Sequence, residues 1–274
     1  MTYYGFSETE QASCHYTPVL DLGQRIALGF GGKFARFEKF GYNSAISTAE
    51  ESLVPYGGLA NFPLVATYPG AKMEVVSSSA DDDGDPVGTG ARTVKIFYLT
   101  SAGVEKTETV TLNGATAVET VATDIWRING FRVKTMGSGQ GAAGNITLQE
   151  IDNAPVFSQI LPGHTRASNS QYTVPAGKCL MVTDVTVASG GVTQDKGFLK
   201  FKIKANLDCD DVASGINLFT RYIIPCGGCE TVIHHLVTPI LVPCGTDLVI
   251  NAEGVAATAG TSAFSAMRGW LITV

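Results

Sequence analysis

The stretch that decides the fold class is residues 73–114, MEVVSSSADDDGDPVGTGARTVKIFYLTSAGVEKTETVTLNG. Val94, Ile96 and Tyr98 occupy every second position at its centre, and a second alternating run leads to Leu112. Because successive side chains of a strand point to opposite faces, this period of two predicts strands with one buried face. The Asn113-Gly114 pair that follows favours positive φ and predicts a tight hairpin turn.

The rest of the chain repeats this pattern. Leu199, Phe201 and Ile203 are separated by lysines, which predicts another half-buried strand. The alternation around Trp126 changes phase after Gly130, which predicts a β-bulge there. Few stretches have a helical period, so the pattern favours an all-β protein over an alternating α/β enzyme fold.

Four predicted β-turns with a shared motif separate the predicted strands. The motif Val/Ile-Pro-x-Gly occurs at residues 54–57, 174–177, 224–227 and 242–245. Proline suits the second position of a β-turn and glycine the fourth, so each copy predicts a turn at the end of a strand. Strands with such punctuation are typical of sandwiches and jelly rolls.

From this organisation we predict two tandem jelly-roll or β-sandwich domains. The first occupies residues 46–150 and the second residues 166–274. Residues 151–165, which contain two prolines and no clear period, are predicted to be a linker. Residues 1–45 are predicted to be an N-terminal arm or extension.

That N-terminal segment carries four regularly recurring phenylalanines, Phe30, Phe34, Phe37 and Phe40, among basic residues. The spacing fits a short helix over residues 32–40, an extended arm on a neighbouring molecule, or a segment folded back on its own domain. We predict that the four phenylalanines contact a partner.

Bulk composition excludes several classes of protein. The 274 residues are 45% hydrophobic and 16% charged, which is typical of a folded chain. A net charge of −6 offers no basic field for nucleic acid or an anionic membrane, so neither is an expected partner. The start of the chain lacks the pattern of a signal peptide, and no apolar run is long enough for a membrane-spanning helix. The six cysteines are therefore expected to be free thiols of a reducing compartment.

Two motifs are candidates for metal chemistry. Asp81–Asp85 is rich in carboxylates, but its spacing departs from that of a calcium-binding loop, so we favour a solvated turn. Cys226 and Cys229 form a C-x-x-C motif, and Cys244 is the nearest further thiol. We favour structural thiols over a zinc site or a redox site, and we predict no cofactor. The four histidines lie in no recognisable catalytic triad motif.

Several segments resemble a module of tailed-bacteriophage virion proteins. They are residues 76–82 (VSSSADD), 88–94 (GTGARTV), 109–118 (TVTLNGATAV), 126–129 (WRIN) and 141–147 (GAAGNIT). Upstream, residues 40–43 (FGYN) and 46–51 (ISTAEE) resemble the entry to this module. Residues 172–178 (YTVPAGK) resemble the start of the β domain that follows it.

The resemblance implies a non-enzymatic structural component of a phage particle, assembled in the host cytoplasm. The first expectation is a capsid decoration or cement protein that binds the lattice of the major capsid protein and forms a homo-oligomer, with a trimer favoured. The alternative is a neck, tail or fibre protein involved in binding a host receptor. An enzyme built on a jelly roll is the third possibility.

Overall fold

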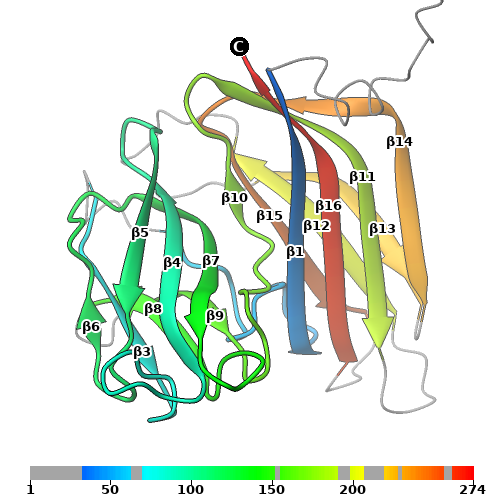
Figure 1. The fold of residues 1–274 in the computed structure, drawn as a ribbon. Coiled ribbons are helices and arrows are strands. Elements are labelled where there is room, and N and C mark those ends of the chain that lie inside the picture. Colours follow the sequence, from blue (N-terminus) through cyan, green and yellow to red (C-terminus); the bar gives the residue numbers. More distant parts are fainter. Residues whose placement is uncertain are drawn as a thin grey trace, which may run out of the picture.

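The structure is a computed structural model that describes residues 33–62, 70–151, 155–190, 198–206, 219–227, 230–255 and 261–274. Every regular element in these ranges is a β-strand, so the prediction of an all-β protein is confirmed. The strands form four sheets, and the sheets pack as two pairs that we call the large unit and the small unit (Figure 1).

The large unit has two sheets, both antiparallel. Its front sheet, nearer the reader in Figure 1, has the strand order β1-β16-β11-β14. These strands are β1 (Phe34–Ile46), β11 (Lys178–Gly190), β14 (Thr231–Val242) and β16 (Thr261–Thr273). Its back sheet has the order β10-β15-β12-β13, and β2 also pairs with β15. These strands are β2 (Glu51–Ser52), β10 (Tyr172–Thr173), β12 (Leu199–Asn206), β13 (Phe219–Cys226) and β15 (Asp247–Gly254).

One apolar cluster fills the space between these two sheets. Val182 and Met267 enter it from the front sheet, and Phe201 and Ile250 enter it from the back sheet. In β12 the apolar residues are buried while the lysines between them are not, which confirms the predicted alternation.

The small unit has its own two sheets and its own core. One sheet has the order β5-β4-β7 and the other β6-β3-β8-β9. The strands are β3 (Met73–Ser77), β4 (Ala91–Leu99), β5 (Glu105–Thr111), β6 (Val118–Glu119), β7 (Arg127–Met136), β8 (Ile146–Glu150) and β9 (Val156–Ile160). The predicted bulge is confirmed, because the pairing of β7 with β4 shifts between Ile128 and Gly130. The turn at Asn113-Gly114 does not close a hairpin, since the strands on either side belong to different sheets.

The two units are not arranged in tandem, because the small unit is inserted into a strand position of the large one. β2 and β10 pair with the same side of β15, Ser52 opposite Asn251 and Tyr172 opposite Leu248. The chain leaves for the small unit after β2 and returns just before β10. The ends of the insertion meet where the Ser170 N–H donates to the Leu53 carbonyl oxygen at 3.1 Å.

The predicted N-terminal arm is wrong for residues 34–45. This segment lies in β1, which pairs with β16 from Phe34 to Ile46, so the segment folds back on its own domain. Gly41 within β1 is required by packing, because a Cβ there would lie 2.6 Å from the Ser170 Cβ.

The predicted linker is also wrong, because residues 156–160 form β9 of the small unit. Phe157 and Ile160 are fully buried in the core of that unit. The strand escaped the sequence pattern because it is short and both Phe157 and Ser158, on opposite faces, are buried.

A buried ion pair joins the two units. Arg127 of β7 donates to the Asp247 carboxylate of β15, with Nε 3.0 Å from Oδ1, and both side chains are buried. The Thr173 hydroxyl also donates to Asp247. Nearby, the bulge residue Asn129 exchanges two hydrogen bonds with the backbone of Thr173. These polar contacts fix the small unit against one end of the large unit.

Candidate interaction surface

The front sheet of the large unit is apolar on both of its sides. In β16, Ala263 and Met267 face the core, whereas Phe264, Trp270 and Ile272 lie on the opposite, outer face. A solvated sheet normally alternates apolar and polar positions, so this outer face departs from the usual pattern. We call it the outer front face; it points toward the reader in Figure 1.

Strand register arranges the outer front face as rows that cross all four strands. In antiparallel strands, paired residues lie on the same face. One apolar row joins Trp270, Met181 and Leu241, with Arg36 at its β1 end. Another joins Phe40, Ala266, Thr186 and Ile233. Leu241 is 64% exposed and Ile233 is 56% exposed, so the apolar surface is accessible at the β14 side.

Aromatic side chains extend this surface toward the end of β1. Phe40 and Phe264 lie with their ring centroids 6.1 Å apart. Tyr42 is paired with Phe264, and Phe34 with Ile272. Together with the two apolar rows, these side chains form a patch across the outer front face of the kind that marks interaction sites.

A single charged row runs between the two apolar rows. It consists of Glu38, Arg268, Asp184 and His235, one residue from each strand. Arg268 Nε donates to Glu38 Oε1 at 3.0 Å, and the His235 ring is hydrogen bonded to Asp184. The Thr183 hydroxyl, followed by His235 and Arg268, holds the pKa of the Asp184 carboxyl below its usual range against the effect of partial burial. Glu38, Arg268 and Asp184 therefore alternate in sign along the row, and the Asp184 carboxyl is ionised at neutral pH.

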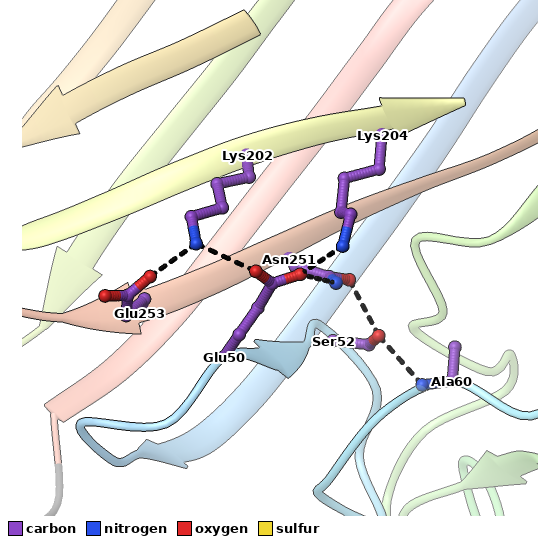
Figure 2. Close-up of polar contacts among 7 residues, drawn as sticks. All are labelled: Glu50, Ser52, Ala60, Lys202, Lys204, Asn251 and Glu253. Carbon is purple, nitrogen blue, oxygen red and sulfur yellow. Dashed lines mark hydrogen bonds and ion pairs between the residues drawn. The ribbon is translucent and has the colours of Figure 1, made fainter. Parts of the chain in front are cut away.

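The outer face of the back sheet is built differently (Figure 2). Glu50 accepts hydrogen bonds from Lys202 at 2.8 Å, Lys204 at 2.7 Å and Asn251 at 2.7 Å, and Glu253 also pairs with Lys202. Burial opposes the ionisation of Glu50, but these hydrogen bonds outweigh it and lower its pKa to about 2. The polar groups satisfy one another, so this face does not call for a partner.

The four predicted contact phenylalanines have different positions. Phe34 and Phe40 lie on the outer front face, where a partner could reach them. Phe37 is buried in the core, with its ring edge-on to Tyr172 at 4.7 Å, so it cannot meet a partner. A spacing of three residues alternates between the two faces of a strand, which separates Phe37 from the other two. Phe30 lies outside the described residues.

The cysteine motif does not assemble a metal centre in the described part of the chain. The Cys226 thiol is buried in the large core and lies 3.6 Å from the Ser189 hydroxyl. Cys244 is exposed, and Cys229 lies outside the described residues. No group of three or more His, Cys, Asp or Glu residues able to hold a metal ion occurs among the described residues. Nor does any helix there have the length and apolarity to cross a membrane.

Within the acidic loop at residues 81–85, the second aspartate, Asp82, has a structural role. Asp82 is fully buried and accepts hydrogen bonds from the Ser77 hydroxyl at 2.6 Å and from three backbone N–H groups. The donors are Ala91, Ala143 and Gly144, at 2.7 to 2.9 Å. Asp82 therefore ties two loops together, and only the rest of the run fits the prediction of a solvated turn.

Most residues of the outer front face were not found from the sequence. Trp270, Met181 and Leu241 lie far apart in the chain and meet only through strand register. A signal did exist in residues 261–273, where both sets of alternate positions carry large apolar side chains. Such a strand is either buried on both faces or covered by a partner.

Comparisons with known proteins give little guidance. No family model and no curated protein matches the chain. Among solved structures, it is similar to one of the infectious bursal disease virus Gx strain, with 10% identity, a TM-score of 0.24, and 88% of this chain and 73% of that chain covered. A structure of the Gt strain gives 9% identity, a TM-score of 0.19, and coverage of 88% and 72%. Both TM-scores are too low to carry an argument.

Proposed function

We propose that this protein is a non-enzymatic structural component of a tailed-bacteriophage virion. The chain would act by binding other virion proteins, in the first place as a decoration or cement protein on the lattice of the major capsid protein. The observation that carries the proposal is the outer front face, because a broad apolar sheet surface serves binding between proteins better than it serves chemistry. The resemblance of residues 40–180 to a module of phage virion proteins is the reason for proposing a phage particle.

We also propose that the large unit is a jelly roll. Its two sheets, β1-β16-β11-β14 and β10-β15-β12-β13, have the strand order of two interlocked Greek keys if β2 and β10 count as one interrupted strand. Jelly rolls are frequent in capsid proteins, which supports the proposed location. The small unit would then be a second sandwich inserted into the jelly roll.

The test is the copy number and position of the protein in purified virions. Quantitative mass spectrometry against the major capsid protein, combined with cryo-electron microscopy, gives both. A decoration protein would be present in numbers close to those of the capsid subunits and would lie on the shell. Absence of the protein from virions would overturn the proposal.

The alternative is a neck, tail or fibre protein that binds a host receptor. It is supported by the small unit, which the buried Arg127–Asp247 pair holds rigidly at one end of the large unit. In Figure 1 the small unit projects beside the large unit, so its loops at the far side are accessible to another molecule. A few copies per particle, confined to the tail, together with binding of the purified protein to host cells, would favour this alternative.

A further inference from the structure

We propose that the outer front face binds the same face of a second copy of this chain, across a twofold axis that runs parallel to the strands between β16 and β11. This inference does not depend on the virion assignment, because the purified protein alone can test it. It rests on three features of the face: the order of its charges, the apolar groups on either side of them, and its extent.

The charge order makes the face complementary to itself. Across the sheet the charged row reads Glu38, Arg268, Asp184 and His235. A twofold axis parallel to the strands reverses this order in the second copy, so Arg268 meets the partner copy's Asp184, and Glu38 meets the partner copy's His235. An axis along the row would instead place each charge against itself, which costs free energy. The alternation of signs therefore selects one of the two simple arrangements.

The same axis brings apolar groups together on both sides of the charged row. Trp270 would meet Met181 of the second copy, because these two residues flank the axis in their row. Phe40 would meet Ile233, because these residues lie at the two ends of theirs. Aromatic and methionine side chains of this kind are enriched at the cores of protein interfaces.

The face is large enough for a stable dimer. Four strands about 4.8 Å apart and five rows about 6.8 Å apart cover roughly 650 Å² in projection, against about 800 Å² of accessible surface per partner in a standard interface. Accessible surface exceeds projected area because side chains protrude, so the two values agree.

The β14 edge of the front sheet is a poorer site for strand addition. In β14 the pairing jumps from Ile240 opposite Val182 to His235 opposite Asp184, which leaves residues 236–239 as a bulge. Pro239 within it lacks an N–H group, and Val237 is fully exposed. Bulges and prolines on an edge strand oppose pairing with another chain, so association through the face is favoured over association through the β14 edge.

The experiment compares wild-type protein with Asp184→Arg and Arg268→Glu by analytical ultracentrifugation over a micromolar concentration series. The wild type is expected to be a dimer. Each variant alone places like charges against each other twice across the axis, so its self-association should weaken by at least about tenfold. An equimolar mixture restores both opposite-charge contacts and should form a heterodimer. This rescue by mixing requires that residue 268 of one copy faces residue 184 of the other, and a complex that stops at two copies requires a closed twofold interface.

Ile223→Lys, on the outer face of the back sheet, is the control and should dimerise like the wild type. Should a charge variant fail to fold, Leu241→Lys takes its place, since this side chain is exposed in the monomer. Loss of the dimer in Leu241→Lys with an unchanged circular dichroism spectrum supports the proposal, and a retained dimer overturns it. A monomeric or trimeric wild type, single variants that dimerise as tightly as the wild type, or a mixture that stays monomeric would each overturn it as well.

Discussion

The two outer faces of the large unit follow the same alternation but carry opposite chemistry. On the back sheet, lysines of β12 project outward and a carboxylate from outside the sheet, Glu50, binds two of them (Figure 2). On the front sheet, Trp270, Met181 and Leu241 project outward, and apart from Arg36 the charged side chains described on this face lie in a single row. Both sheets contribute apolar side chains to the core between them. The difference therefore concerns only what each sheet presents to its surroundings: a polar network whose groups pair with one another on the back sheet, and exposed apolar side chains on the front sheet.

The largest expected effect comes from breaking the front sheet itself with Gly269→Ala. A Cβ at this position would lie 1.9 Å from the carbonyl oxygen of Met181, and backbone atoms cannot move away without disturbing the pairing of β11 with β16. We expect a loss of about 3 kcal/mol in the free energy of unfolding, measured by urea denaturation.

Gly227→Ala, at the end of a back-sheet strand, is the matched control. Its Cβ would meet only the flexible carboxylate of Glu230, at 2.8 Å, so the cost should stay within about 0.5 kcal/mol. Equal losses in the two variants would contradict the importance of close strand packing at Gly269.

The inner side of the front sheet should tolerate charge less well than its outer side. Lys39 of β1 is opposite Met267 on the inner side, and its ammonium group donates to the Asn129 carbonyl oxygen at 2.6 Å. Burial, with a smaller effect from Arg166, lowers the pKa of Lys39 to about 7 from 10.5. The unfolded chain then binds more protons than the folded chain between these values, so stability should rise as the pH rises from about 7 toward 10.5.

Lys39→Met should remove this rise, because methionine does not titrate. We expect the variant to be more stable than the wild type below pH 7 by about 1 kcal/mol, because the relief of burying a charged ammonium group exceeds the loss of one hydrogen bond. Denaturation curves measured at several pH values, with exposed Lys33→Met as the control, give the comparison. A wild-type profile that is flat over this range would refute the prediction.

The polar network of the back sheet should be sensitive to acid. The pKa of Glu50 is about 2 in the folded protein and 4.5 in the unfolded chain, so its contribution is present above pH 4.5 and is lost as the pH falls toward 2. Because the carboxylate is partly exposed, we expect this contribution to be only about 1 kcal/mol after solvent screening.

Glu50→Gln should therefore cost about 1 kcal/mol at neutral pH and flatten the acid limb of the stability profile. Glu253→Gln, which removes a single contact of Lys202, should cost less. Thermal unfolding monitored between neutral and acidic pH separates the two variants. An acid limb unchanged in Glu50→Gln would show that the network is not what stabilises this face.

Two single lysine substitutions, Leu241→Lys on the outer front face and Ile223→Lys on the outer face of the back sheet, should have the smallest effect on stability. They also test the difference between the two faces most directly. Leu241 is 64% exposed and Ile223 is 57% exposed in the single chain, so lysine at either position should change the free energy of unfolding of the monomer by less than about 0.5 kcal/mol. Size-exclusion chromatography should show loss of self-association for Leu241→Lys and none for Ile223→Lys. The reverse result would mean that the contact surface lies on the back sheet.

The sequence was sufficient wherever the information is local. Alternation around Val94 and Leu199 identified half-buried strands, because a pleated strand exposes every second side chain regardless of its neighbours. The phase change at Gly130 identified a real bulge for the same reason. Residues 34–46 were harder, since Phe34, Phe37 and Phe40 have a helical spacing that the pairing with β16 overrides.

The sequence by itself determined that this protein is all-β and where many of its strands and turns lie. Tertiary structure alone decided that β1 belongs with β16, that the small unit interrupts a strand of the large one, and that Trp270, Met181 and Leu241 share a row. The physical reason is that periodicity reports which side of a strand is apolar, whereas the register between distant strands depends on packing over the whole core. A strand with two apolar sides looks the same in sequence whether its second side meets the core or a partner, and only the assembled sheet distinguishes them.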